Sequence, residues 1–408
     1  MPMGDLLWPG DERAGTVFSD AAVLEAMVAV EEAWLGALAA AGVGPEPVAL
    51  TGVVGPADLE TLATGAESGG NPVIGLVRLL RERTGSTWVH RGLTSQDVLD
   101  TALVLCLRAA LDAVLADVER QARALARHVV EHRATLMAGR TLTQHAVPIT
   151  FGLKASTWLL GLADATVVLR RVREDLPAQA GGAAGTLAAT VELAGDLPDP
   201  VGAAAEALRD LARRLALQGG APWHTRRAAV TGAADALVTL SDTWGRIGGD
   251  VALLSRPEIG ELREAAGGGS STMPGKANPV LSVLLRRHAL AAPGLASTLH
   301  TAAASYVDER PDGAWHAEWD TLRTLARRSV VAASQAADLL EGLVVDAERM
   351  TARATDADET LRAEQRSMGA ATGRGGQGGE PPYLGANDLI IDNTLERAAR
   401  VWEDIRWS

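Results

Sequence analysis

The 408-residue sequence lacks the features that mark secreted, disulfide-linked and membrane-spanning proteins. Its one cysteine, Cys106, cannot form a disulfide within the chain, which is typical of a reducing compartment. Because Cys106 lies in an apolar repeat, we expect a small buried hydrophobe. The sequence has no run of about 20 uninterrupted apolar residues and no signal-peptide pattern at the N-terminus. We therefore expect a cytoplasmic protein without a membrane span.

The sequence also lacks an excess of positive charge. Its formal net charge is −13, which gives it no electrostatic reason to bind nucleic acid or an anionic membrane. No phosphate-binding glycine motif follows an expected strand, and no His, Cys or Asp cluster has metal-ligand spacing. His128 and His132 are four residues apart, but we expect them in a solvated, charged stretch with no third ligand. The sequence predicts no metal and no cofactor.

Phe and Tyr are scarce, at two residues each, whereas Ala, Leu and Arg are abundant. This composition favours helix almost everywhere and predicts an all-α fold. A first helix is expected over residues 20–41, capped by Ser19 or Asp20. Longer helical patterns cover residues 97–133, 147–176, 226–254, 280–304 and 318–343. Their narrow apolar stripes favour a bundle that packs against other subunits over a monomeric bundle.

Three polar segments interrupt the apolar helices, each at the end of a long one. The first covers residues 90–97. Thr94 or Ser95 could cap the helix that follows, but capping would explain neither His90 nor Arg91.

The second polar segment covers residues 139–148. His145 lies about one turn before an expected helix, beside Gln144 and Thr141, which offer only neutral hydrogen bonds. A lone histidine is usually structural, but these surroundings make His145 a candidate general acid or base.

The third polar segment, residues 267–279, is the most informative. Its glycines would let backbone N–H groups approach an anion, and Lys276 and Asn278 add a charge and an amide. Ser270 or Ser271 could act as a base only if backbone dipoles and Lys276 stabilised its alkoxide. No Gly-x-Ser-x-Gly elbow is present, which disfavours an acyl-enzyme hydrolase.

Together the three segments resemble the signature regions of the fumarase/aspartase superfamily. The resemblance is carried by Thr-Ser-Gln-Asp at 94–97, by residues 139–148, and by Gly-Ser-Ser-x-Met-Pro-x-Lys-x-Asn-Pro at 269–279. Within the superfamily the likeness is greatest to the bacterial 3-carboxy-cis,cis-muconate cycloisomerases. It covers most of residues 15–350 and includes Trp-His-Ala-Glu-Trp at 315–319. Adenylosuccinate lyases usually carry an arginine where this chain has Trp319.

The resemblance implies a homotetramer whose active sites each draw on three subunits, and a small polycarboxylate substrate. It implies an N-terminal helical domain (1–100), a central bundle (101–346) and a shortened C-terminal domain (347–408). Within the last, composition predicts a Gly-rich linker over 373–382 and a final helix over 387–405. By position, Ser270 is the expected base and His145 the expected acid. The expected substrate-binding residues are His90, Arg91, Thr94, Ser95, Thr141, Gln144, Ser271, Met273, Lys276, Asn278 and Arg310.

Two departures from the family pattern bear on the substrate. Gly275 and Ala277 stand where cycloisomerases usually have His and Arg, and the helical hairpin expected after Met350 is missing or replaced by the linker. The resemblance implies cyclisation of 3-carboxy-cis,cis-muconate in aromatic catabolism, by the β-ketoadipate pathway. Two alternatives remain open: an adenylosuccinate lyase or another fumarate-releasing lyase, and a helical scaffold that has lost catalysis.

Overall fold

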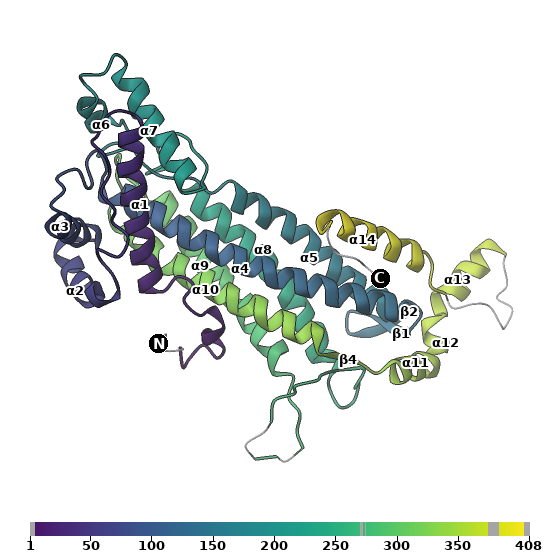
Figure 1. Ribbon diagram of the computed structural model, residues 1–408. Coiled ribbons are helices and arrows are strands. Elements are labelled where there is room, and N and C mark those ends of the chain that lie inside the picture. The colour runs from purple at the N-terminus through teal and green to yellow at the C-terminus, as the bar shows by residue number, and fades with distance from the viewer. Residues whose placement is uncertain (1–4, 270–271, 274, 374–382, 404–408) are drawn as a thin grey trace. The chain divides into compact units, whose positions relative to one another are not determined.

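The computed structural model describes residues 5–269, 272–273, 275–373 and 383–403 (Figure 1). Within these residues the chain is mostly helical, which confirms the all-α prediction, and strands form only two small sheets. The long helices are α4 (Ser95–Glu131), α5 (Phe151–Glu174), α8 (Ala228–Leu254), α9 (Val280–Ala304) and α10 (Gly313–Glu341).

The shorter elements flank these helices in the sequence. The helices are α1 (Asp20–Ala40), α2 (Leu59–Gly69), α3 (Val73–Thr84), α6 (Ala188–Leu193), α7 (Pro200–Arg214), α11 (Ala347–Asp356), α12 (Asp358–Leu361), α13 (Ala363–Thr372) and α14 (Asn387–Val401), with 3-10 turns η1 (Asp11–Ala14) and η2 (Pro56–Asp58). The strands are β1 (Leu136–Thr141), β2 (Gln144–Thr150), β3 (Leu262–Glu264) and β4 (Leu343–Val345).

The chain forms two compact units. The first comprises Met1–Ala113, Leu169–Val238 and Ala292–Val331, and the second comprises Val114–Val168, Thr239–Ala291 and Ala332–Ser408. Each of the five long helices contributes residues to both units. This division does not test the expected boundaries at residues 100 and 346, so the three-domain organisation stays a prediction.

In the first unit, α1 begins where the sequence predicts. The Ser19 Oγ accepts a hydrogen bond from the Ala22 N–H at 3.2 Å, which satisfies one of the free donors of the first turn. Trp34 and Leu38, one turn apart, are fully buried, and α1 packs along α7. The Trp34 indole also donates to the Arg91 carbonyl, which holds α1 next to the segment that carries His90.

In the second unit, one buried glutamine links three of the long helices. The Gln121 side chain of α4 donates to the Ala333 carbonyl of α10 at 2.8 Å and accepts from the Trp244 indole of α8 at 2.8 Å. Gln121 and Trp244 have no exposed surface. A satisfied polar group in an apolar bundle specifies how the helices align, because any slip would leave it unpaired.

The prediction of a helix from residue 147 was wrong for its first four residues. Residues 147–150 instead belong to β2, which pairs antiparallel with β1 from Leu136↔Thr150 to Thr141↔Gln144, and α5 starts at Phe151. His145 therefore lies in a strand and not one turn before a helix. A short run of β-branched residues beside a helix has no periodicity that separates strand from helix.

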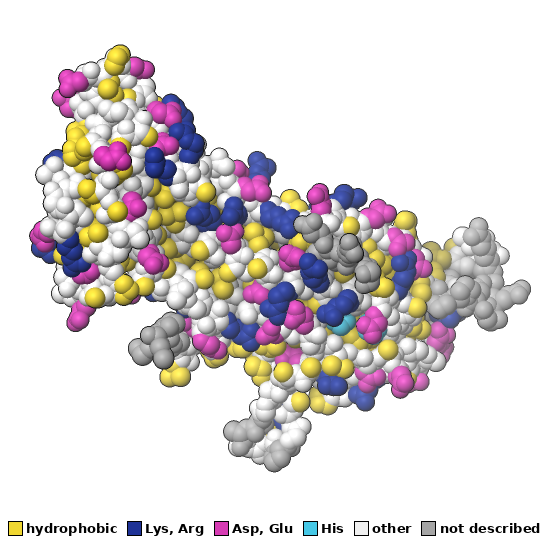
Figure 2. Space-filling view, viewed as in Figure 1, with side chains coloured by type: hydrophobic (Ala, Val, Ile, Leu, Met, Phe, Trp, Pro, Cys, Tyr) yellow, Lys and Arg dark blue, Asp and Glu magenta, His cyan; other side chains and the backbone are white. Residues whose placement is uncertain are grey.

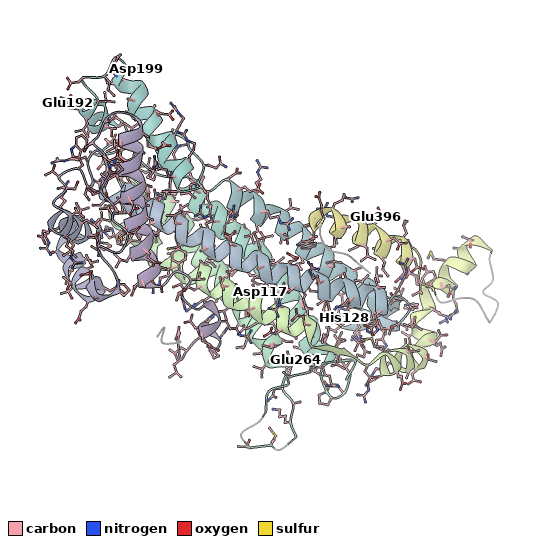
Figure 3. The ribbon with its side chains drawn as sticks, in the orientation of Figure 1. Asp117, His128, Glu192, Asp199, Glu264 and Glu396 are labelled. Carbon is pink, nitrogen blue, oxygen red and sulfur yellow. The ribbon has the colours of Figure 1, made fainter. Side chains whose placement is uncertain are left out.

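The prediction that His128 and His132 are solvated was also wrong. The rings stack at 6.1 Å, His132 is 9% exposed, and both rings meet the edge of Phe151. The His128 Nε2 lies 3.0 Å from the Leu340 carbonyl (His128 is labelled in Figure 3). Burial lowers the pKa of both imidazoles below the usual value, because it disfavours the charged form.

After Met350 the chain is more ordered than the sequence suggests. The short helices α11, α12 and α13 fill residues 347–372, and Arg133 pairs with Asp388 and Asp392 of α14 at 2.9 and 2.6 Å. The last helix ends at Val401, before the expected residue 405, and most of the Gly-rich linker lies outside the described residues. None of the described helices is long and apolar enough to cross a membrane.

Candidate functional site

Asp97 organises the first polar segment. Its buried carboxylate accepts hydrogen bonds from the backbone N–H groups of Thr94, Gly181 and Gly182, each at 2.9 Å, and lies 2.7 Å from the His224 Nε2. Thr94 therefore occupies the cap position of α4, and Asp97 satisfies its N–H as in half of a capping box. The carboxylate ties the start of α4 to a glycine loop more than 80 residues away in sequence.

Ser95 is the first residue of α4, so of the two hydroxyl residues it is Thr94 that holds the cap position. Thr94 is 9% exposed, whereas Ser95 is partly exposed.

Figure 2 shows Lys and Arg interspersed with Asp and Glu on the visible face, so the acidic balance of the chain does not give that surface a single sign of charge.

His90 and Arg91 are held by α1. The His90 Nδ1 lies 2.6 Å from the Glu31 Oε1, and the Trp34 indole N–H donates to the Arg91 carbonyl at 2.7 Å. Glu31 is fully buried, whereas the Arg91 guanidinium is exposed and donates to the Thr87 carbonyl at 2.9 Å. His90 is thus a candidate substrate-binding residue of the first unit whose ring is oriented by a buried carboxylate.

A buried charge network lies one turn further along α4. The Arg227 guanidinium donates to both oxygens of Asp100 at 2.8 and 3.1 Å and to both oxygens of Glu318 at 2.6–3.2 Å. The Trp315 indole donates to Asp100 at 2.9 Å. Burial raises the pKa of Glu318 above its usual value, although Arg227 opposes this. Burial also lowers the pKa of Arg227, and Asp100 and Glu318 more than offset that effect.

The second polar segment forms the tip of the β1–β2 hairpin. Thr141 and Gln144 pair across the turn, and His145 faces Arg140. The two turn residues, Leu142 and Thr143, have positive φ angles of 47° and 69°. Positive φ angles fit a two-residue hairpin turn, but they are unusual for residues other than Gly, Asn or Asp.

The side chains of Gln144 and His145 project into solvent at this tip, and Leu142 is 95% exposed. Among the described residues, the His145 ring has no hydrogen bond or ion pair. Strained backbone that carries exposed polar groups is typical of functional segments. His145 is therefore available to a ligand, but nothing in the described part of its own chain orients it.

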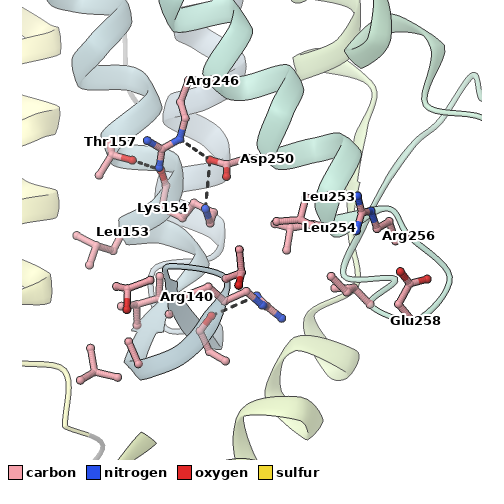
Figure 4. Close-up of a pocket in the computed structure, with 18 residues that line it drawn as sticks. Arg140, Leu153, Lys154, Thr157, Arg246, Asp250, Leu253, Leu254, Arg256 and Glu258 are labelled. Carbon is pink, nitrogen blue, oxygen red and sulfur yellow. Dashed lines mark hydrogen bonds and ion pairs between the residues drawn. The ribbon is translucent and has the colours of Figure 1, made fainter. Parts of the chain in front are cut away.

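A pocket of about 810 Å³ opens beside the hairpin (Figure 4). Thr141 lines it, together with the ends of α5 and α8, whereas Gln144 and His145 do not. Lys154 and Arg246 both pair with Asp250, at 3.2 and 3.0 Å. Burial alone would raise the pKa of Asp250, but these two cations and a hydrogen bond from Trp158 lower it overall. The Asp250 carboxylate therefore offsets one of the two positive charges that an anionic ligand would meet at Lys154 and Arg246.

The third polar segment is a loop closed at its base. Gly268 and Asn278 exchange backbone hydrogen bonds of 2.9 and 2.8 Å, and the Asn278 side chain donates to the Gly269 carbonyl at 3.3 Å. A Cβ at position 268 would lie 2.2 Å from Val280, which explains the need for glycine. Glu264 of β3 (labelled in Figure 3) accepts from the Leu281 and Ser282 N–H groups and so caps α9, where the loop ends.

Within this loop, Lys276 is exposed and Met273 is 50% exposed, as a ligand-binding loop requires. The expected base Ser270 and its neighbour Ser271 lie outside the described residues. Arg310 is exposed in the connection between α9 and α10.

The candidates divide between the two units. The first segment and Arg310 belong to the first unit, and the hairpin and the loop belong to the second. The assembly of these segments into one site, and the role of every residue in it, stay predictions. Among the described residues, no group of three His, Cys, Asp or Glu side chains is arranged to hold a metal ion, and cofactor independence stays a prediction as well.

Sequence reasoning missed Glu31 and the Asp97–His224 pair. Glu31 lies on the apolar side of α1, four residues after Met27 and three before Trp34, and a charge at such a position is the signal that could have identified it. His224 lies in none of the three polar segments. Its partner lies 127 residues away, so no local pattern reports the contact.

Comparisons with known proteins show which family the chain belongs to. Residues 57–294 match the model of a family described as lyase. The chain is 43% identical over 358 residues to a nitrosuccinate lyase of Streptomyces davaonensis, which covers 83% of this chain and 75% of that protein. It is also 43% identical over 337 residues to a 3-carboxy-cis,cis-muconate cycloisomerase of Bradyrhizobium diazoefficiens, covering 80% of this chain and 72% of that protein.

Among solved structures, the 3-carboxy-cis,cis-muconate lactonizing enzyme from Pseudomonas putida is similar over 97% of this chain and 99% of that one. The two are 30% identical, with a TM-score of 0.78. The family model covers more than half of the sequence, and the likeness to solved structures extends over nearly all of it. The chain belongs to the lyase family of the fumarase/aspartase superfamily.

Proposed function

We propose that this chain is a cofactor-independent cycloisomerase that converts 3-carboxy-cis,cis-muconate to 4-carboxymuconolactone. The observation that carries the proposal is the likeness to cycloisomerases, at 43% identity over 80% of the chain and with a structural match over 97% of it. Three polar segments that offer hydroxyl, amide, imidazole and ammonium groups support it, because such groups bind carboxylates.

In the proposed reaction, a carboxylate oxygen of the substrate adds to the alkene carbon β to another carboxylate and forms the C–O bond of the lactone. The alkene electron pair moves to the α carbon and is delocalised into that carboxylate. Ser270 then delivers a proton to the α carbon, which reverses its role as base in the elimination direction. His145 is placed beside the attacking oxygen, and Lys276, Asn278, Thr94 and Arg310 hold the carboxylates.

The proposed assembly is a cytoplasmic homotetramer with shared active sites. Large apolar side chains are exposed along two long helices, namely Val167 and Val168 of α5 and Val283 and Leu290 of α9, at 45–83%. Exposed apolar surface of this kind marks protein–protein contacts. The exposed hairpin tip at Leu142 also fits a segment that reaches a neighbouring subunit.

A second candidate is a lyase that releases nitrite and fumarate from nitrosuccinate. The 43% identity to a nitrosuccinate lyase over 83% of the chain favours it. The loop residues Gly275 and Ala277 also fit, since they supply no cation and this substrate has one carboxylate fewer than carboxymuconate. In this reaction the base removes a proton from the CH₂ group, the C–N bond breaks, and nitrite leaves with the bonding electrons. Trp319 argues against adenylosuccinate.

One experiment separates these functions. The purified protein is incubated in turn with 3-carboxy-cis,cis-muconate, nitrosuccinate and adenylosuccinate. Loss of the muconate ultraviolet absorbance supports the cycloisomerase. Nitrite release with fumarate formation identifies the nitrosuccinate lyase, and fumarate release from adenylosuccinate identifies the third activity. A folded tetramer that is inactive on all three substrates would favour the catalytically silent scaffold.

A further inference from the structure

His90 and Glu31 form a short contact, and a second residue of α1 binds the segment that carries His90. The Nδ1 of His90 lies 2.6 Å from one carboxylate oxygen of Glu31, and the His90 side chain is 17% exposed. Trp34, three residues further along α1, binds the Arg91 carbonyl at 2.7 Å. Side chains three apart lie on one face of a helix, so that face of α1 holds both residues of the His-Arg pair.

A carboxylate at position 31 is expected to cost stability. The Glu31 side chain is fully buried, and its second oxygen, Oε2, is buried with no hydrogen-bond partner among the described residues. Burying a polar oxygen without a partner costs free energy, and an apolar side chain of similar length would avoid that cost. Stability alone therefore does not explain a carboxylate at position 31.

His90 has a backbone conformation that also needs support. Its φ angle is +65°, and Gly92 follows at +85°, so the chain turns sharply just before Thr94. A positive φ costs free energy in residues that carry a side chain, although histidine adopts it more readily than most, and such strained residues cluster at functional sites. Because the Glu31 oxygen faces Nδ1, that nitrogen carries the hydrogen and the ring orientation is fixed. The Nε2 atom is then the one left for a ligand.

We propose that Glu31 is a positioning residue that fixes the tautomer and orientation of His90, so that the His90 Nε2 binds a carboxylate or other anionic group of the substrate. This inference rests on the proposed function, since it takes the site to act on a polycarboxylate. It gives the two histidines different tasks. His90 is oriented within its own subunit, whereas the exposed His145 has no such partner among the described residues.

The test compares two substitutions of Glu31 with a matched control. Glu31→Met removes the hydrogen-bond acceptor and keeps the length, whereas Glu31→Gln keeps an acceptor oxygen. Glu25 is exposed on the same helix, so Glu25→Met makes the same chemical change away from His90. We expect Glu31→Met to lower kcat/KM about 10- to 100-fold, the range found when a group that orients a functional histidine is removed, mainly through a higher KM. Glu31→Gln should stay within about threefold of wild type, and Glu25→Met should have no effect.

Two further measurements exclude a merely structural role. The Tm of Glu31→Met should lie close to that of wild type, because removal of the unpaired buried oxygen of Glu31 offsets the lost hydrogen bond to His90. In a His90→Gln background, Glu31→Met should cause no further loss of activity, because Glu31 acts through His90. Wild-type activity or a lower Tm in Glu31→Met would overturn the inference. So would a double variant in which the activity losses of Glu31→Met and His90→Gln multiply fully. Inactive wild-type protein would instead refute the proposed function, and the Tm comparison would still stand.

Discussion

Removal of the Arg227 charge should destabilise the chain strongly. The guanidinium lies between Asp100 and Glu318, and the side chains of all three are at most 2% exposed. The guanidinium carbon of Arg227 lies 4.7 Å from the centre of the Trp223 ring. Arg227→Met keeps much of the volume that packs there but leaves two buried carboxylates without this cation. Breaking a buried ion pair in this way costs about 3–5 kcal/mol. We expect the free energy of unfolding at pH 7 to fall by that amount.

The pH dependence of this loss has a definite sign. The pKa of Glu318 is already raised by burial against the attraction of Arg227, and it should rise further once that attraction is gone. A carboxyl whose pKa is higher in the folded than in the unfolded state takes up a proton on folding. Its ionised form destabilises the folded state, and this destabilisation decreases as the pH falls. The difference between variant and wild type should therefore be smaller at pH 5 than at pH 7.

The assay is urea unfolding at fixed protein concentration, since assembly would make the midpoint concentration-dependent. Arg226→Met is the matched control, because Arg226 is the exposed neighbour and, among the described residues, its guanidinium donates to two backbone carbonyls and to no carboxylate. It should change stability by less than about 1 kcal/mol. The reasoning is refuted if Arg227→Met also costs less than about 1 kcal/mol at pH 7, or if its cost grows on acidification.

Three further predictions concern other buried groups. Burial raises the pKa of Cys106 to about 12, so iodoacetamide should leave it unmodified at pH 8 in the native protein and alkylate it in urea; rapid native labelling would contradict this. Because the folded-state pKa values of His128 and His132 are lowered, the unfolded chain binds more protons on acidification, and stability should fall as the pH drops through about 6.5. Replacing both with Gln should flatten that decline in urea midpoints, and an unchanged decline would assign it elsewhere. Asp97→Asn should cost about 2–4 kcal/mol in urea unfolding, since one amide oxygen cannot accept from four donors, whereas an unchanged midpoint would show that the carboxylate is dispensable.

The sequence predicts regular helices well where local signals are sufficient. The boundaries of α9 and the start of α1 follow from the apolar period and from the Ser19 cap. The β1–β2 hairpin escapes prediction because Leu142 and Thr143 replace the Gly or Asn that usually marks such a turn. The first turn of the expected helix was therefore assigned wrongly.

Candidate site residues are predicted only as far as they lie in contiguous motifs. Thr94 and Lys276 stand in segments whose composition differs visibly from the helices around them. Glu31 and His224 do not, because each acquires its role from a partner 59 or 127 residues away. Such contacts depend on tertiary packing, which the pattern of one segment does not encode.

The central claim is that Ser270 performs proton transfer at carbon in an addition or elimination on a polycarboxylate. It is tested most directly by the rate of carboxymuconate loss and of nitrite release in wild type and Ser270→Ala, with the oligomeric state checked for both. The account predicts turnover by wild type of one of these substrates and a rate at least about 100-fold lower in Ser270→Ala, as expected for loss of a general acid–base group. Full activity in Ser270→Ala would contradict it.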